Sequence, residues 1–127
     1  GLRIFSLDRI KSLTLTERTF SYPKDFVPGN YFKDVFGIIA IGGGKAENIT
    51  IRAYAELSDY LRSLPMHHSQ RALETTDGHT DFSLHLIPTF DFIQELLLHR
   101  DQLEVLAPES LRTEISNLII KMKQRYG

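Results

Sequence analysis

Cysteine is absent from the 127-residue sequence, which excludes disulfide bonds, thiolate zinc sites and cysteine nucleophiles. A chain without cysteine is compatible with a reducing compartment, and we expect it in the cytoplasm. Long apolar runs are also lacking, since none approaches the roughly 20 residues that a membrane span needs. No membrane partner is therefore expected.

Charge of one sign is not in excess either. Fifteen basic residues oppose sixteen acidic ones, which leaves a formal net charge of −1. Such a chain has no overall attraction for nucleic acid, so any binding of nucleic acid must come from a local patch. The length and the hydrophobic content of 42% fit one globular domain, or one domain with the edge of another.

The first residues alternate like a β-strand, with no turn or helix cap before them. In a strand over residues 2–10, one face would carry two arginines and two apolar residues: Arg3, Arg9, Phe5 and Leu7. This pattern suits the last strand of a larger domain, so we expect Gly1 to be an artificial start and the chain to be the C-terminal piece of a longer protein. Without its sheet, the segment is expected to pair with residues 11–20, to pair with another copy, or to be poorly ordered.

Residues 21–46 are predicted to form a connecting loop. Prolines and glycines interrupt any regular pattern there, while five rings add apolar surface: Tyr22, Phe26, Tyr31, Phe32 and Phe36. We expect the rings to hold the loop against a neighbouring surface, with a short helical turn near residues 31–35.

From residue 47 onward the periodicity is regular. It predicts strands near 47–52, 69–76, 79–87 and 102–106, and helices near 53–64 and 90–100, the second with Thr89 as its N-cap. Asp77-Gly78 predicts a hairpin between the second and third strands. A last helix is predicted from Pro108, and its apolar stripe would consist of Leu111, Ile115, Leu118, Ile119, Met122 and Tyr126. The order predicts an α+β fold: a ferredoxin-like split β-α-β (βαββαβ) sheet with both helices on one face, plus the extra C-terminal helix.

Several segments also resemble one family of proteins. Arg3-Ile4-Phe5-Ser6-Leu7-Asp8-Arg9-Ile10 resembles the R-x-F-x-L-x-R-I strand that closes the WYL domain of bacterial transcriptional regulators. The rest is similar to the C-terminal extension of these regulators, the WCX domain, in short motifs: Phe36-Gly37-Ile38, His68-Ser69-Gln70, and Glu104-Val105-Leu106-Ala107-Pro108 followed by Leu111-Arg112. The resemblance implies a WYL remnant over residues 1–20, the connecting loop over 21–46 and the extension over 47–127. Duplex DNA would be bound only by a missing N-terminal helix-turn-helix domain.

Two motifs that suggest other chemistry are not supported by their context. Gly42-Gly43-Gly44-Lys45 is not a phosphate loop, because Ile39 and Ala46 stand where Gly and Ser or Thr are required, and a flexible turn is expected. The five histidines do not have metal-ligand spacing: His67 and His68 are adjacent and would face opposite ways on a strand. We therefore expect no metal and no other cofactor.

Arg3 and Arg9 are the first candidates for ligand binding. A guanidinium group beside apolar side chains can pair with a phosphate and stack on a base, although solvated arginines on an edge strand are the alternative. The resemblance implies the same role, since WYL domains are regarded as sensors whose basic groove receives nucleotide-like or oligonucleotide ligands. Arg52 and Arg71 could extend this patch.

The motif His68-Ser69-Gln70 allows two interpretations. His68 and Gln70 could present polar groups to a ligand, or the triad could serve only as a turn in which Ser69 bonds the backbone. Carboxylates are scattered around the predicted hairpin rather than paired, and no nucleophile elbow is found, so no enzymatic activity is expected.

Residues and resemblance together predict the C-terminal sensing and dimerisation region of a transcriptional regulator. Its expected partners are a second copy of the chain, a nucleotide or oligonucleotide effector, and DNA through the missing domain. The alternative is a stand-alone ferredoxin-like regulatory domain that binds a small molecule and has no link to nucleic acid. An open reading frame that starts near residue 1 would favour that alternative.

Overall fold

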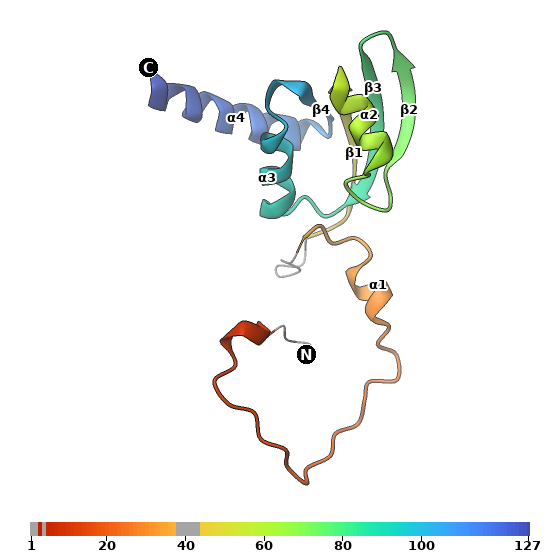
Figure 1. The fold of residues 1–127 in the computed structure, drawn as a ribbon, viewed down its shortest axis with the longest axis vertical. Coiled ribbons are helices and arrows are strands. Elements are labelled where there is room, and N and C mark those ends of the chain that lie inside the picture. Colours follow the sequence, from red (N-terminus) through yellow and green to blue (C-terminus); the bar gives the residue numbers. More distant parts are fainter. Residues whose placement is uncertain (1–2, 4, 38–43) are drawn as a thin grey trace.

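The computed structural model describes residues 3, 5–37 and 44–127. Its regular part is α+β, with one four-stranded antiparallel sheet in the strand order β2-β3-β1-β4. The strands are β1 (Glu47–Tyr54), β2 (Arg71–Thr76), β3 (His79–Leu86) and β4 (Leu103–Ala107). Four helices accompany them (Figure 1): α1 (Pro28–Phe32), α2 (Glu56–Ser63), α3 (Phe90–Leu98) and α4 (Glu109–Tyr126). The predicted order of strands and helices from residue 47 onward is confirmed.

The central hairpin forms where the sequence predicts it. β2 and β3 pair antiparallel from Thr76 opposite His79 to Arg71 opposite Ser83, with a register shift along β2. Gly78 in the turn has φ of +95°, which glycine adopts without steric cost.

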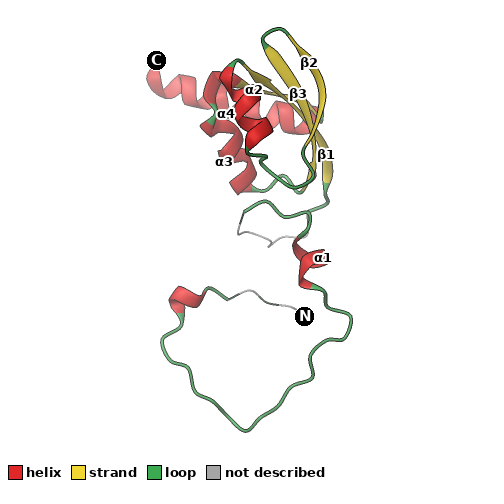
Figure 2. Cartoon of the chain, turned by 45° about the vertical axis from the view of Figure 1, so that its right-hand side comes forward, coloured by secondary structure: helices red, strands yellow, loops and turns green. Residues whose placement is uncertain are grey.

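Alternation along β1 determines which face of the sheet is covered. Ile49, Ile51 and Ala53 are fully buried and pack in one core with residues of α2 and α3, the helices that connect the strands. The helical members of this core are Leu57, Leu61, Phe92, Ile93 and Leu96. Helices α2 and α3 therefore cover the same face of the sheet, as Figure 2 also shows.

Helix boundaries differ from the prediction at two points where the backbone has positive φ. α2 begins at Glu56 rather than at residue 53, because β1 continues to Tyr54 and Ala55 then turns with φ of 49°. α3 ends at Leu98 rather than at residue 100, and Arg100 with φ of 55° lies in a short 3₁₀ turn before β4. Its predicted N-cap is confirmed, since the Thr89 hydroxyl accepts a hydrogen bond from the Phe92 N–H at 3.4 Å.

The predicted strand over residues 2–10 is wrong for the residues that the structure describes. Leu7–Arg9 form a 3₁₀ turn, and no strand occurs in residues 3 and 5–37. A strand needs a neighbour for its hydrogen bonds, and residues 5–20 lie apart from the sheet in Figure 1. The turn also breaks the alternation that would have placed Arg3 and Arg9 on one face with two apolar side chains. Pairing with another copy stays a prediction.

Residues 34–36 attach the connecting loop to the domain. Four of its rings contact one another in series in tilted or edge-to-face arrangements, and α1 begins at Pro28, earlier than the turn predicted near residues 31–35. Phe36 packs edge-on against Phe92, with ring centroids 5.2 Å apart, and the Ile87 N–H donates to the Asp34 carbonyl at 2.8 Å. Gly42 and Gly43 of the predicted flexible turn lie outside the described residues.

Candidate functional site

The face of the sheet opposite α2 and α3 carries the polar residues of the two central strands. Directly paired residues share a face, so the alternation of β1 and its register with β3 assemble them in two rows. They are Asn48, Thr50, Arg52 and Tyr54 on β1, and His85, Ser83, Asp81 and His79 on β3. We call this surface the open face.

Arg52 and Asp81 form a bidentate ion pair on the open face. The Arg52 Nε donates to Asp81 Oδ1 at 2.7 Å, and Nη2 donates to Oδ2 at 2.9 Å. The Arg52 side chain is 30% exposed and that of Asp81 12% exposed. The hydrogen bond from Arg52 lowers the pKa of Asp81, and Asp81 in turn raises the pKa of Arg52. A phosphate that used Arg52 would have to compete with this carboxylate.

A second polar cluster joins the open face to α4. The Tyr54 hydroxyl donates to Glu104 Oε2 at 2.7 Å, and Arg112 Nη1 donates to Glu104 Oε1 at 2.8 Å and to the Val105 carbonyl at 2.6 Å. These bonds lower the pKa of Glu104 and raise the pKa of Tyr54. Sequence reasoning missed this cluster, although the alternation of β1 and the strand order bring Tyr54 and Glu104 to one face.

Gln70 is buried and fully engaged by the backbone. Its Nε2 donates to the Leu61 carbonyl at 2.8 Å, and its Oε1 accepts from the Met66 N–H at 2.9 Å. Arg71 Nη1 donates to the carbonyls of His68 and Gln70 at 3.0 and 2.8 Å, while His68 itself is exposed. In this geometry Gln70 bridges the turn between α2 and β2.

Ser69 links the hairpin to His67 and the connecting loop. Its Oγ accepts from the His85 N–H at 2.8 Å and lies 2.7 Å from His67 Nδ1. Because Nδ1 also accepts from the Ser69 N–H at 3.2 Å, it carries no proton. Burial lowers the pKa of His67, while the neighbouring backbone of Lys33 and Val35 acts in the opposite direction. The imidazole thus lies between the hairpin and residues 33–35 of the connecting loop.

The six candidate ligand residues do not form one cluster. Arg71 lies beside His68 and Gln70, and the register places it on the same face as Arg52, two strands away. Arg3 and Arg9 are exposed on the N-terminal segment, which lies apart from the sheet (Figure 1). The chain alone therefore assembles no single basic groove among the residues that the structure describes.

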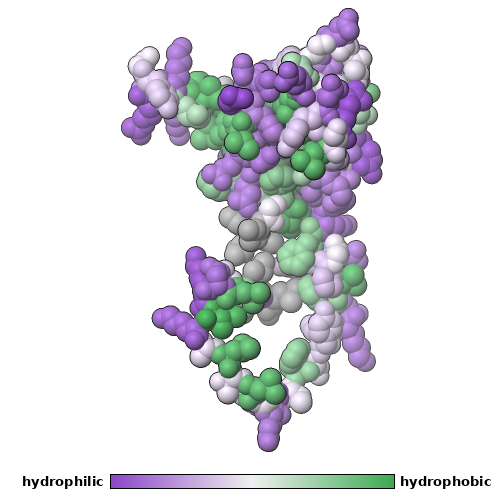
Figure 3. Space-filling model, in the orientation of Figure 1, coloured by the Kyte–Doolittle hydropathy of each residue, from purple (hydrophilic) through white to green (hydrophobic). Residues whose placement is uncertain are grey.

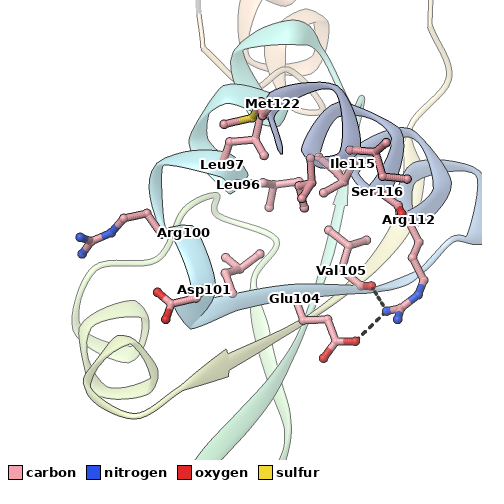
Figure 4. Close-up of a pocket in the computed structure, with 13 residues that line it drawn as sticks. Leu96, Leu97, Arg100, Asp101, Glu104, Val105, Arg112, Ile115, Ser116 and Met122 are labelled. Carbon is pink, nitrogen blue, oxygen red and sulfur yellow. Dashed lines mark hydrogen bonds and ion pairs between the residues drawn. The ribbon is translucent and has the colours of Figure 1, made fainter. Parts of the chain in front are cut away.

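An apolar groove lies between α3 and α4, and we call it the α3–α4 groove. It has a volume of about 610 Å³ and lies over β4. Its apolar lining comes from Leu96, Leu97, Leu103, Val105, Ile115, Ile119, Ile120 and Met122. Figure 4 shows Leu96, Leu97, Ile115 and Met122 converging, with Arg100 and Asp101 at the margin. Local periodicity cannot reveal such a groove, because it depends on how three consecutive elements, α3, β4 and α4, pack on one another.

Neither a metal site nor a membrane span is found in the described part. No group of three or more histidine, aspartate and glutamate side chains in residues 3, 5–37 and 44–127 is arranged to hold a metal ion. No helix in the same ranges is both long enough and apolar enough to cross a membrane.

The fold defines a small α+β domain with a long C-terminal helix. The family model of the WCX domain matches residues 45–122, which is more than half of the chain. The protein therefore belongs to the WCX domain family, the C-terminal extension of WYL-type transcriptional regulators, and its resemblance to this extension is confirmed over residues 45–122. The resemblance of residues 3–10 to the closing strand of a WYL domain lies outside this match and stays a prediction. A search among curated proteins found no match to the chain.

Proposed function

We propose that this chain is the C-terminal sensing and dimerisation region of a bacterial helix-turn-helix transcriptional regulator. In this role it is non-catalytic and cytoplasmic, and it transmits the binding of a nucleotide-like or oligonucleotide effector to DNA-binding domains elsewhere in the parent protein. The observation that carries the proposal is the WCX match over residues 45–122. Regulation of transcription is the role of this family, whereas the effector and the dimer are our inference.

We also propose that the domain is ferredoxin-like. The strand order β2-β3-β1-β4 supports this assignment, because it is the order in which two split β-α-β units interleave. The antiparallel pairing of every neighbouring pair of strands supports it as well.

Effector binding would be sensed on the N-terminal side of the domain. Arg3 and Arg9 are exposed, and among the described residues neither guanidinium group has an ion-pair partner. In contrast, Arg52 is already paired with Asp81, so the two N-terminal arginines are the better phosphate ligands.

The attachment of the connecting loop offers a route from effector to domain. Residues 34–36 bond the junction between β3 and α3 through Asp34 and Phe36. An effector that fixes the segment before this attachment would favour one orientation of the extension over others. In a dimer, that orientation sets the spacing of two DNA-reading domains, and with it the affinity for paired half-sites.

The test uses the full-length parent and a panel of nucleotides and short single-stranded oligonucleotides. We expect at least one member to bind in calorimetry and to change the affinity for operator DNA. Arg3→Ala and Arg9→Ala should each weaken effector binding about tenfold, because each removes a charge-assisted contact. Lys11→Ala on the same segment is the matched control. An unresponsive parent, or arginine variants that bind like the lysine control, would contradict the proposal.

A further inference from the structure

Helix α4 carries an apolar stripe that continues past the body of the domain. Leu111, Ile115 and Leu118 in its first half pack on the core. Farther around and along the helix, Ile119 and Met122 are each 51% exposed, and Tyr126 is 92% exposed. Figure 1 shows this second half projecting beyond α3. An apolar stripe that extends beyond the domain on which the helix packs is typical of a helix that contacts a further partner.

The exposed part of the stripe borders the α3–α4 groove. Ile119, Ile120 and Met122 form its outer wall, and Leu96 and Leu97 of α3 lie opposite. The space-filling view shows apolar side chains at the surface over this region of α3 and α4 (Figure 3). Helix and groove therefore form one continuous apolar surface with a convex part and a concave part.

The charges of α4 are divided between its halves. The second half carries Lys121, Lys123 and Arg125, whereas Glu109 and Glu114 lie in the first half. The arginine of the first half, Arg112, is paired with Glu104. Two such helices side by side in antiparallel orientation place each basic half against the acidic half of the other, and their dipoles oppose as well.

We propose that a second copy of the chain covers the α3–α4 groove. The two α4 helices cross antiparallel about a two-fold axis, and the projecting half of each lies in the groove of the other. Both parts of the surface are present in one chain, so the contact is self-complementary, as a two-fold interface requires. This inference rests on the dimerisation part of the proposed function and names the residues that perform it.

The first experiment measures the mass of the 127-residue chain by analytical ultracentrifugation across a concentration series. Ile119→Asp and Met122→Asp should each raise the dimer dissociation constant about a hundredfold, because each places a carboxylate in the buried contact. Both side chains are half exposed in the single chain, so its circular dichroism spectrum should not change. Leu73 on β2 is an apolar residue of similar exposure, so Leu73→Asp is the matched control and should dimerise like the wild type.

A charge swap tests the antiparallel orientation. Lys123→Glu combined with Arg125→Glu should weaken the dimer about tenfold, and adding Glu109→Lys and Glu114→Lys to the same chain should restore it. Restoration in one chain is specific to this geometry, since each copy supplies both charged halves.

The outcomes separate this interface from the proposed function. Aspartate variants that dimerise normally would overturn the interface while dimerisation itself stands. A wild-type chain that is monomeric at every concentration would overturn both the interface and the proposed dimerisation. If such a monomer binds the apolar dye anilinonaphthalene sulfonate and loses it on Ile119→Asp, the groove is a small-molecule site and our assignment of its occupant is wrong. Effector binding by the parent depends on none of these results.

Discussion

Gln70 provides a direct test of whether the His68-Ser69-Gln70 motif is structural or binds a ligand. Gln70→Met keeps the length of the side chain but removes the donor to the Leu61 carbonyl and the acceptor for the Met66 N–H. The Leu61 carbonyl is one of the last in α2, and such carbonyls have no partner within the helix. Its bond to Gln70 is buried, whereas the Met66 N–H is partly open to water.

The expected cost follows from these two groups. An unsatisfied buried group costs about 1–3 kcal/mol and a partly solvated one less, so Gln70→Met should lose about 2–4 kcal/mol of unfolding free energy. A domain of this size should then melt roughly 10–20 °C lower. Circular dichroism melts and urea titrations measure both quantities. Gln94→Met, an exposed glutamine on α3, is the matched control and should change little.

A second substitution separates loss of packing from loss of hydrogen bonding. Gln70→Glu retains an acceptor for Met66 but directs a carboxylate at the Leu61 carbonyl, so it should destabilise at neutral pH and recover as acid protonates the new side chain. If Gln70→Met melts like the wild type while the parent loses effector affinity, the structural reasoning is refuted and Gln70 is a ligand residue.

Two further predictions concern the connecting loop. Because burial lowers the pKa of His67, its stabilising contribution is complete above its ordinary pKa of about 6.5 and is lost as the pH falls below that value. His67→Gln should remove this part of the pH dependence in urea titrations, whereas His85→Gln should retain it. Gly37→Ala should destabilise the fold more than Gly78→Ala. Both glycines have positive φ, which costs alanine about 1–2 kcal/mol of stability. At Gly37 the new Cβ would in addition lie 2.5 Å from Asp91 Oδ2, whereas at Gly78 it would meet no atom within 4 Å. Thermal melts and limited proteolysis of the loop compare the two.

Most of the sheet could be predicted from the sequence because each signal was local. Alternation identified β1, the Asp77-Gly78 turn identified the hairpin, and the Thr89 cap identified the start of α3. The N-terminal segment could not be predicted in the same way. Its alternation is compatible with a strand, but a strand forms only beside a partner, and the partner cannot be read from periodicity.

The polar residues of the site were only partly predictable. Arg52 was identified as a charged group on a strand, but its ion pair with Asp81 depends on the exact register of β1 and β3. Gln70 was identified as polar in a turn, yet its burial depends on how the chain folds back after α2. The α3–α4 groove depends on how α4 packs. The sequence indicated the apolar stripe of this helix, but not how much of the stripe the domain leaves exposed.

The position of β1 in the sheet has a mechanical consequence. The connecting loop enters the domain through this strand, which is hydrogen-bonded to β3 along its whole length and to β4 over its second half. Tension that passes the contacts of residues 34–36 would have to shear two ladders together. In contrast, α4 follows an edge strand, and its second half extends beyond the residues that pack on the core. The domain is thus stiff toward whatever precedes it and compliant at its C-terminal helix. A displacement received through the loop would move the whole sheet as one body, and the softest element that could respond is α4.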